Sequence, residues 1–323
     1  MKLIVQIPCH NEEKTLPLTV RDLPREIEGI DTVEILVIDD GSTDRTVEVA
    51  KEIGVDHIIK NPNNRGLARA FQAGLDASLR LGADIIVNTD GDNQYKGEYL
   101  PKLIAPILAG EADIVVADRQ TDRIPHFSAT KKRLQKIGSF LVRFLSETEV
   151  ADAVSGFRAF SRDAAMQMNI LSPYTYTIET VIQAGKKHLA VTNVKVETNP
   201  ATRRSRLFKN LPNYLERSIS TMIRMYTMYQ PLRTFFYIGC ILILCGFIPS
   251  TRFLIFYLKG QGGGHIQSLI LAAVLFIVGF QALMIGLVAD VISFNRRIIE
   301  ETLLRVRRIE LDCLHPKKDS ENE

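Results

Sequence analysis

Two aspartates separated by one glycine follow an apolar run and form the part of this sequence best suited to chemistry. The apolar run starts at Ala83, and Asp90, Gly91 and Asp92 come directly after its end. In an open α/β sheet, ligands bind beyond the carboxyl ends of the strands. Two carboxylates there repel each other, and a divalent cation such as Mg²⁺ or Mn²⁺ carrying a phosphorylated ligand would remove that cost. The alternative is an ordinary turn rich in Asp and Gly.

The elements that would position these aspartates alternate between strand and helix. Strand patterns cover residues 3–7, 33–38, 57–59, 85–88 and 113–117, and helical patterns cover 12–23, 46–53, 67–81 and 99–109. This alternation predicts an α/β fold with a mostly parallel sheet whose two faces are covered by helices. Three of the strands are followed by acids, namely Asp39 and Asp40, Asp90 and Asp92, and Asp118 beside Arg119. A parallel sheet would bring these groups to one edge, as in a nucleotide crevice.

Composition narrows the class of protein. The chain has 323 residues, of which 46% are hydrophobic, and a net charge of only +3, and no nucleic-acid partner is expected. Its four cysteines show no spacing typical of zinc or of a disulfide framework. Neither a phosphate loop, a dinucleotide glycine motif nor a Ser-His-Asp set is evident. The chemistry must therefore come from carboxylates, a metal and basic residues.

The last third of the chain holds nearly all the long apolar runs. Spans are predicted at about 234–258 and 266–291, each long enough to cross a bilayer. Arginines precede the first span and follow the second, whereas the loop between them holds only Lys259 and His265. The positive-inside rule therefore predicts a multi-pass protein of the cytoplasmic membrane with both termini in the cytoplasm. The predicted parts are an α/β domain at 1–210, an interfacial region at 211–231, a transmembrane hairpin at 232–294, and a cytoplasmic helix and tail at 295–323.

Two further features concern the membrane part. Apolar residues recur at helical spacing over 211–229, which predicts a helix lying in the membrane interface; the alternative is a helix packed on the soluble domain. Small residues that would permit close helix approach, and with it a homo-oligomer, are Gly239, Gly246, Gly279 and Gly286.

Four motifs in the first 200 residues, taken in order, resemble those of the family 2 glycosyltransferases. The segment Pro8–Glu12 resembles the P-x-x-N-E opening, and Asp39–Asp44 resembles the D-D-G-S-x-D segment that receives the nucleoside. The segment Asn64–Ala70 resembles N-x-G-x-x-x-A, and Asp90–Asp92 resembles the D-x-D metal motif. The resemblance implies a GT-A fold, which is Rossmann-like, followed by interfacial helices and the two-helix transmembrane hairpin.

Within that family, the likeness is greatest to the polyprenyl-phosphate glycosyltransferases, the group that includes dolichyl-phosphate mannose synthases and bacterial polyisoprenyl-phosphate glucosyltransferases. The stretch Asp90–Gln94 matches their D-x-D-x-Q form, and Ser155–Arg158 resembles their S-G-F-R segment. Residues 202–207 resemble their basic S-K-L loop, but with Arg206 in place of lysine and without the glycine. The resemblance implies a nucleotide-sugar donor, Mg²⁺ or Mn²⁺, and a polyprenyl phosphate acceptor in the bilayer.

Carried onto this sequence, the resemblance gives each motif a role. The implied nucleotide-binding residues are Pro8, Asn11, Glu12, Asp39, Asp40, Asp44, Asn64, Gly66, Asp90 and Gly91. The implied metal ligands are Asp90, Asp92 and Gln94, and the implied catalytic residues are Asp92, Arg119 and Arg203. Candidates for the acceptor phosphate are Arg119, Lys132, Arg133, Arg203 and Arg206, since arginine suits phosphate recognition; each could instead be a solvated surface charge. Candidates for sugar binding are Ser155, Gly156, Phe157, Arg158 and Glu179, and for Glu179 a buried structural ion pair is the alternative.

The predicted activity is the inverting, metal-dependent transfer of one sugar from a nucleotide donor to a polyprenyl phosphate at the cytoplasmic face. A UDP-sugar is preferred as donor, and the lipid is dolichyl or undecaprenyl phosphate. One alternative is a polysaccharide synthase with a hydroxyl acceptor, although the Q-x-x-R-W segment of such synthases is excluded because the chain has no Trp. The other is a non-catalytic membrane anchor that binds nucleotide.

Overall fold

Residues of the first two-thirds of the chain build one mixed sheet with helices on both faces. The structure, a computed structural model, describes residues 1–120, 145–172, 175–200 and 211–315, together with 138, 140, 142 and 143. Within these residues the sheet has seven strands in the order β3-β2-β1-β4-β6-β5-β7. The strands are β1 (Lys2–Cys9), β2 (Thr32–Asp39), β3 (His57–Lys60), β4 (Ile85–Asn88), β5 (Ile114–Asp118), β6 (Arg158–Ser161) and β7 (Val191–Lys195).

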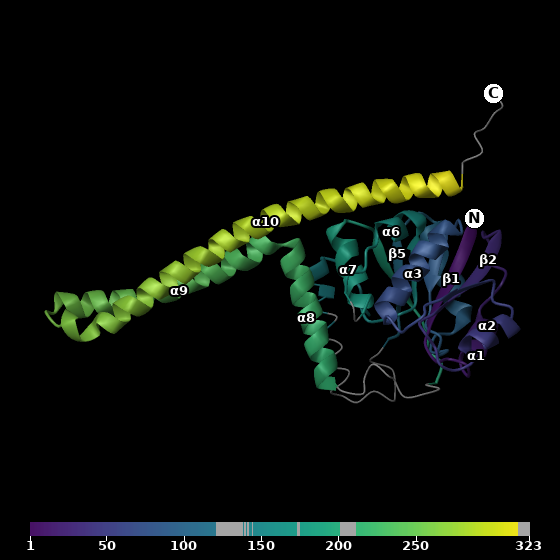
Figure 1. Cartoon of the computed structure of the whole chain (residues 1–323), viewed down its shortest axis with the longest axis horizontal. Helices are drawn as coiled ribbons and strands as arrows, with labels where there is room; N and C mark the ends of the chain where they lie inside the picture. The colour runs from purple at the N-terminus through teal and green to yellow at the C-terminus, as the bar shows by residue number, and fades with distance from the viewer. Residues whose placement is uncertain are drawn as a thin grey trace, which may run out of the picture. The chain divides into compact units, whose positions relative to one another are not determined.

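The helices of this part follow the strands closely along the chain (Figure 1). They are α1 (Leu16–Asp22), α2 (Thr46–Glu52), α3 (Leu67–Arg80), α4 (Leu100–Leu108), α6 (Arg162–Gln167) and α7 (Thr177–Lys186). The predicted alternation is confirmed, and β4 has the predicted bounds. The predicted helix at 12–23 is shorter in the structure, because Glu12 to Thr15 form a hydrogen-bonded turn before α1 begins.

Alternate residues of the strands divide the core into two layers. One layer joins Leu3, Val5 and Ile7 of β1 to the buried faces of α1, α2 and α4. The opposite face of the sheet carries α3, whose Gly74 lies so close that an added Cβ would meet Gln6 Oε1 at 2.4 Å. Strands buried on both faces are expected in such three-layer folds and read as continuous apolar runs.

Strand β6 is the one departure from parallel pairing among the described strands. It lies between β4 and β5 and runs antiparallel to both, pairing Ile85 with Ser161 and Ile114 with Phe160. The other pairs, β1 with β2 and β4, β2 with β3, and β5 with β7, are parallel. This insertion carries the segment before β6, residues 152–157, to the edge where β4 ends.

Three long helices follow the sheet: α8 (Leu211–Tyr229), α9 (Pro231–Leu258) and α10 (Ile266–Leu314). The described chain divides into two compact units, residues 1–222 with 304–323 and residues 223–303. Helix α9 and a segment reaching through α10 are long and apolar enough to cross a membrane, and only 11% and 22% of their apolar windows are buried. Helix α10 has 49 residues, about 73 Å at 1.5 Å per residue, against about 30 Å of hydrocarbon in a bilayer. The predicted domain boundaries at 210, 231 and 294 stay a prediction.

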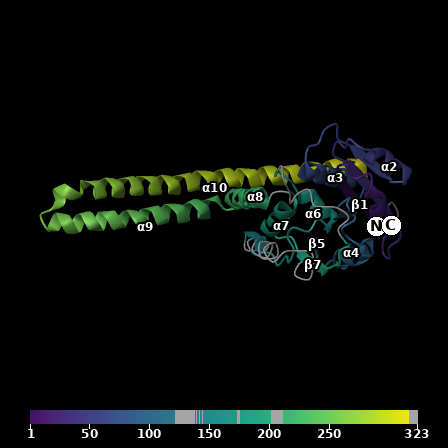
Figure 2. The same cartoon turned by 90° about the horizontal axis from the view of Figure 1, so that it is seen from below.

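Glycines bring α9 and α10 into close contact, and the two helices run side by side in both views (Figures 1 and 2). A Cβ added to Gly239 would lie 2.8 Å from the carbonyl oxygen of Gly279, and one added to Gly286 would lie 2.9 Å from Phe235 Cβ. Gly246 packs in the same way against Phe276. These glycines therefore pack the two helices of the hairpin against each other, and the predicted homo-oligomer stays a prediction.

The end of α10 is bonded to the unit that holds the sheet. Arg307 Nη1 donates to the carbonyl oxygens of Met166 and Met168 at 2.9 and 3.0 Å, and its Nη2 lies 3.4 Å from Asp76 Oδ1. Arg80 donates to Glu310 at 2.9 Å, and Leu311 is buried. Residues 304–315 thus belong physically to the α/β domain, to which the sequence assigns only residues 1–210.

We expect Arg307→Ala to lower the unfolding free energy of the α/β domain by roughly 2 kcal/mol, since it leaves two capped carbonyls without their charged donor. The exposed Arg308, whose contact to Asp163 is 4.0 Å, gives the matched control Arg308→Ala. Melting is followed by dye labelling of the buried Cys9 in a protein with Cys240, Cys245 and Cys313 replaced by alanine. A drop of about 4–8 °C in Tm for Arg307→Ala and almost none for Arg308→Ala is the expected result; equal melting of the two variants contradicts it.

Candidate active site

The carboxyl ends of four parallel strands lie along one edge of the sheet. Strands β1, β2, β4 and β5 end at Cys9, Asp39, Asn88 and Asp118. Cys9 pairs with Asp39, and Gln6 pairs with Asn88, so the loops that follow are neighbours. The structure thereby brings together the three acid-bearing strand ends of the sequence. In sheets of this kind, ligands bind at such an edge.

The carboxylates of the adjacent residues Asp39 and Asp40 have different hydrogen-bond partners. The carboxylate of Asp40, 4% exposed, accepts hydrogen bonds from Asn61 Nδ2, Arg65 N and Gly66 N at 3.0, 2.9 and 2.7 Å. Asp40 therefore positions the loop at 61–66, and its predicted role in nucleotide binding stays a prediction. Asp39 Oδ1 accepts from Ser42 N at 3.1 Å, whereas its buried Oδ2 has no hydrogen-bond partner in the described part of the chain.

A hydrogen-bonded network joins the loops after β1 and β2. Asn11, with φ +56°, accepts from Thr43 N at 2.8 Å and donates from its own N to Ser42 Oγ at 2.9 Å. Asp44 accepts from Glu13 N and from Thr46 at 3.2 and 3.0 Å. Burial raises the pKa of the Asp44 carboxyl, but the bonds from Thr46 and from the Glu13 backbone outweigh burial and hold that pKa below its usual value.

The remaining residues predicted at the nucleotide end sit within this framework. Pro8 is buried in β1 beside Ile38, and Glu12 accepts from Thr15 Oγ1 at 2.7 Å. Asn64 accepts from Gly66 N at 2.9 Å, and Gly66 has φ +91°. These contacts shape the loops, and a direct role of each residue in nucleotide binding stays a prediction.

The paired aspartates occupy a tight loop directly after β4. Asp92 Oδ1 accepts from Gln94 N at 3.2 Å, and Asn93 between them has φ +54°. The carboxylate of Asp90 lies against Gly156, where an added Cβ would be 2.6 Å from Asp90 Oδ2. Only a glycine at 156 leaves room for this carboxylate, so the S-G-F-R segment shapes the metal motif through its glycine.

This donor set fits a divalent cation that is shared with a phosphorylated ligand. No group of three His, Cys, Asp or Glu side chains able to hold a metal occurs among the described residues. Mg²⁺ in particular is usually held by one or two carboxylates, with water and substrate phosphates completing its coordination. Asp90 and Asp92 supply such a pair. The buried Asp39 Oδ2, which has no hydrogen-bond partner among the described residues, offers an acceptor at the end of β2, two strands away from β4 in the sheet.

The chain returns to the metal motif just before the basic loop. Asn199 N donates to the Gln94 carbonyl oxygen at 2.9 Å, and Asn199 Nδ2 donates to the Asn93 carbonyl oxygen at 3.1 Å. Tyr95 forms an isolated β-bridge with Thr198. The backbone of Asn93–Tyr95 is thus fixed from outside the loop, which holds Asp92 in place.

Tyr95 is a site residue that the motifs do not indicate. Its hydroxyl accepts from Gly156 N at 2.8 Å, and its ring lies 5.2 Å from that of Phe157. Burial raises the pKa of Tyr95 to about 12, so the hydroxyl stays protonated at neutral pH. The sequence signal that could have indicated Tyr95 is its position next to Gln94. Its hydrogen-bond partner Gly156 lies 61 residues further along the chain, so the contact itself could not be predicted.

Arg119 forms a buried, bidentate ion pair with Asp152. Nε and Nη2 of Arg119 donate to the two carboxylate oxygens at 2.6 and 3.0 Å. Burial raises the pKa of Asp152, but the adjacent Arg119 outweighs burial and holds that pKa below its usual value of 3.8. The charge of Arg119 is thus already balanced, and its predicted contact with the acceptor phosphate would use its remaining donors.

We expect Asp152→Asn to cost roughly 3–5 kcal/mol of stability at pH 7, because it leaves the Arg119 charge buried and unbalanced. A carboxyl whose folded-state pKa is depressed stabilises the fold fully above its unfolded pKa, near 3.8, and less as pH falls through the folded pKa. The difference in unfolding free energy between wild type and variant should therefore be constant from pH 7 to about pH 5 and shrink below about pH 4. Denaturant unfolding at each pH measures it, and equal stability at pH 7 would refute the role of the pair.

Three of the predicted sugar-binding side chains are buried in supporting roles. Arg158 is 0% exposed and donates to the carbonyl oxygens of Ala153, Ser155 and Thr177 at 2.6–2.8 Å. Burial lowers the pKa of Arg158 to about 10, which still leaves it charged at neutral pH. Glu179, also 0% exposed, accepts from Leu171 N and Ser172 N at 2.9 and 2.8 Å.

Phe157 is the third of these, and it packs in the core. The three side chains are buried in the interior, where they support the fold, and their predicted sugar contacts stay a prediction. Ser155 is also buried, within 3.4 Å of the Tyr95 hydroxyl, and Gly156 borders Asp90. The predicted residues Lys132, Arg133, Arg203 and Arg206 lie outside the described residues.

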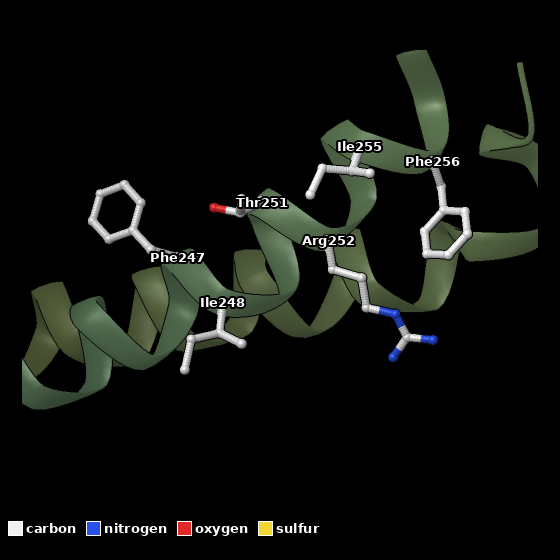
Figure 3. A pocket seen from close by; sticks show the side chains of 6 residues that line it. All are labelled: Phe247, Ile248, Thr251, Arg252, Ile255 and Phe256. Carbon is white, nitrogen blue, oxygen red and sulfur yellow. The ribbon is translucent and has the colours of Figure 1, made fainter. Parts of the chain in front are cut away.

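An apolar groove of about 510 Å³ on α9 is a separate feature (Figure 3). Its lining comes from one stretch of a single helix and consists of Phe247, Ile248, Thr251, Arg252, Ile255 and Phe256. It holds no carboxylate or amide that could bind a metal or a sugar. Its composition is typical of a helix face in contact with lipid tails.

The comparisons with known proteins agree with the fold and with the motifs. The seven-stranded mixed sheet is that of the GT-A fold. The chain resembles a solved structure of glucosyl-3-phosphoglycerate synthase from Mycobacterium tuberculosis in complex with Mn²⁺, UDP-glucose and phosphoglyceric acid. The two superpose with a TM-score of 0.57 at 23% sequence identity, and the match covers 70% of this chain and 79% of that chain. A family model for glycosyl transferase family 2 matches residues 4–168. The chain belongs to the family 2 glycosyltransferases and is an enzyme of that family.

The names of two relatives contain a polyprenyl phosphate, as the acceptor or as part of the product. The UDP-N-acetylglucosamine–dolichyl-phosphate N-acetylglucosaminyltransferase of Methanococcus voltae is 30% identical over 217 residues, which is 59% of this chain and 83% of that protein. The polyprenol monophosphomannose synthase of Mycolicibacterium smegmatis is 28% identical over 206 residues, 60% of this chain and 76% of that protein. The predicted likeness to the polyprenyl-phosphate group is confirmed.

Proposed function

We propose that this enzyme transfers one hexose from a UDP-sugar to a polyprenyl phosphate at the cytoplasmic face of the membrane, with inversion at the sugar carbon. The observation that carries the proposal is that one chain joins a two-carboxylate strand-end site to two helices apolar enough to cross a membrane. The names of the Methanococcus voltae and Mycolicibacterium smegmatis relatives support the acceptor class. The UDP-glucose complex of the fold neighbour and the UDP-sugar in the name of the Methanococcus voltae relative favour a UDP donor.

Asp90 and Asp92 would hold Mg²⁺ or Mn²⁺, with Gln94 completing the motif. Such an ion, when bound, neutralises the charge that develops on the departing diphosphate. Asp39 Oδ2, buried and without a partner in the described chain, would accept a hydrogen bond from the nucleoside. Gly156 borders the Asp90 carboxylate and is itself bonded to Tyr95, and together they hold Asp90 and its loop in one conformation, which is the preorganisation that such catalysis requires.

The acceptor needs no strong general base. A phosphate monoester already carries negative oxygens near neutral pH, so the protein has to bind it and orient it toward the sugar. Arg203 and Arg206 would contribute cations, and they follow Asn199, which is bonded to Gln94, by only four and seven residues.

The helices supply access to the lipid. In the proposed topology α9 and α10 cross the membrane, both termini are cytoplasmic, and α8 lies in the interface. Ile219 and Ile223 of α8 are 47% and 61% exposed, an apolar surface that a membrane interface would cover.

A transfer assay tests the proposal. Full-length enzyme in detergent receives Mn²⁺, undecaprenyl phosphate and, in separate reactions, radiolabelled UDP-glucose, UDP-N-acetylglucosamine and GDP-mannose. Chloroform-soluble label from one UDP-sugar is expected, and the matched control, undecaprenol without its phosphate, should give none. Equal label on undecaprenol, a polymeric product, or no product from any donor would overturn the proposal.

A further inference from the structure

Arg296 of α10 has one edge of its guanidinium without a hydrogen-bond partner among the described residues. Its Nη1 donates to Glu300 Oε1 at 2.7 Å, and the guanidinium carbon lies 4.0 Å from the centre of the Tyr229 ring. Its Nε and Nη2 are buried, and neither has a hydrogen-bond partner within the part of the chain that the structure describes. Buried donors of a charged group are normally paired, so this edge is the place for a ligand.

Two other buried arginines of the same chain show what a satisfied guanidinium looks like. Arg119 uses this same Nε and Nη2 edge to bind both oxygens of Asp152, at 2.6 and 3.0 Å. Arg158 donates from Nε and Nη2 to backbone carbonyl oxygens. The Nε–Nη2 edge is a planar fork that matches two oxygens of a carboxylate or a phosphate. At Arg296 that fork is formed and held by Tyr229 and Glu300, but no oxyanion of the described chain fills it.

The position of Arg296 along the chain indicates which oxyanion is available. Arg296 comes five residues after the predicted end of the second span at 291, and Tyr229 comes five residues before the predicted start of the first span at 234. Five helical residues cover about 7.5 Å, which corresponds to the headgroup layer of roughly 5–8 Å on each side of the hydrocarbon. Tyrosine is itself enriched at this depth. The abundant anion in this layer is the phosphate of a lipid.

The surroundings suit such a ligand. Ser293, one turn before Arg296, donates to the Met228 carbonyl oxygen at 3.1 Å and so joins α10 to the end of α8. Glu300 engages the opposite side of the guanidinium and leaves the fork free of a carboxylate. The whole Arg296 side chain is 17% exposed, while the Nε and Nη2 atoms of the fork are themselves buried. All these residues belong to the same compact unit, residues 223–303.

We propose that the Nε–Nη2 fork of Arg296 binds a lipid-borne phosphate in the headgroup layer, with the ring of Tyr229 stacked on the guanidinium. The ligand class is a phosphate monoester or diester on an apolar chain. The proposal concerns binding alone and stands or falls independently of sugar transfer.

Native mass spectrometry of the full-length protein in detergent tests the proposal. The protein is titrated in separate experiments with undecaprenyl phosphate, with phosphatidylglycerol, and with undecaprenol as the control that lacks phosphate. The variants are Arg296→Met, which keeps the apolar stem, and Arg296→Lys, which keeps the charge but not the planar fork. The matched control is Arg297→Met, the exposed neighbour of the same charge.

Both Arg296 variants should bind lipid phosphate at least tenfold more weakly than wild type, with Arg297→Met within twofold of wild type and undecaprenol unaffected throughout. Loss for undecaprenyl phosphate alone identifies the monoester lipid as the ligand, and loss for both lipids identifies the headgroup phosphate; either supports the site. Unchanged binding of both lipids by Arg296→Lys and Arg296→Met overturns it. If Arg296→Met does not fold, lipid binding by Arg296→Lys alone decides the outcome, because this variant preserves a cation over the Tyr229 ring.

Discussion

Asp92→Ala should abolish sugar transfer while leaving the α/β domain folded. The aspartate is partly exposed in a loop, so its removal opens no core cavity, but it takes away one of the two carboxylates proposed to hold the metal. Loss of the metal's charge stabilisation, at least about 4 kcal/mol in the transition state, corresponds to roughly 10³-fold in rate. The measurement is kcat/KM for lipid-linked product, together with the melting temperature of the variant.

The control for Asp92→Ala is Glu111→Gln, which neutralises an exposed acid in the loop between α4 and β5. It should retain wild-type kcat/KM, so that loss of one surface charge does not account for the effect. Mn²⁺ titration of both variants by isothermal calorimetry in the presence of UDP separates metal loss from a general defect. Near-normal transfer by Asp92→Ala would remove the metal role from this motif.

Gly156→Ala is expected to have the second largest effect, although residue 156 carries no functional group. The new Cβ would lie 2.6 Å from Asp90 Oδ2 and 2.8 Å from Oδ1, so the carboxylate must move. Changes that displace a metal ligand from outside typically cost 10–100-fold in metal affinity or activity. We expect the Kd for Mn²⁺ to rise by about that factor and kcat/KM to fall with it.

Gly138→Ala is the matched control, since a Cβ there meets no atom of the described residues within 4 Å. It should leave both the Kd for Mn²⁺ and kcat/KM unchanged. Added Mn²⁺ provides a further check, because a displaced ligand weakens binding and saturating metal should restore part of the activity of Gly156→Ala. A variant with normal Mn²⁺ affinity and low activity would show that Gly156 acts on something other than Asp90.

The local elements were the most predictable part of the fold. Strand β4 and helix α8 have the bounds that the sequence predicts, because apolar periodicity is a property of neighbouring residues. The paired aspartates could be located for the same reason, since they stand directly after such a strand. The placement of strand ends at one edge followed from parallel pairing, which the alternation of strands and helices implies.

The contacts that give each acid its role were not predictable. Asp39 and Asp40 are adjacent and chemically identical, yet Asp40 is used by a loop 21 to 26 residues away while Asp39 keeps a buried oxygen without a partner in the described chain. Arg158 belongs to a motif, and only its burial shows that it supports backbone carbonyls. Hydrogen-bond partners of this kind depend on which segments the fold brings together.

For this protein, the sequence by itself determined the family, the order of strands and helices from β1 to β5, the paired carboxylates at a strand end and the apolar hairpin, because each depends on adjacent or regularly spaced residues. Only the tertiary structure decided that β6 inserts antiparallel beside β4, that Gly156 therefore borders Asp90 and bonds to Tyr95, and that the glycines of the hairpin pack against their own partner helix. These contacts join residues 30 to 76 positions apart, and such pairings are selected by the packing of the whole core rather than by any local preference.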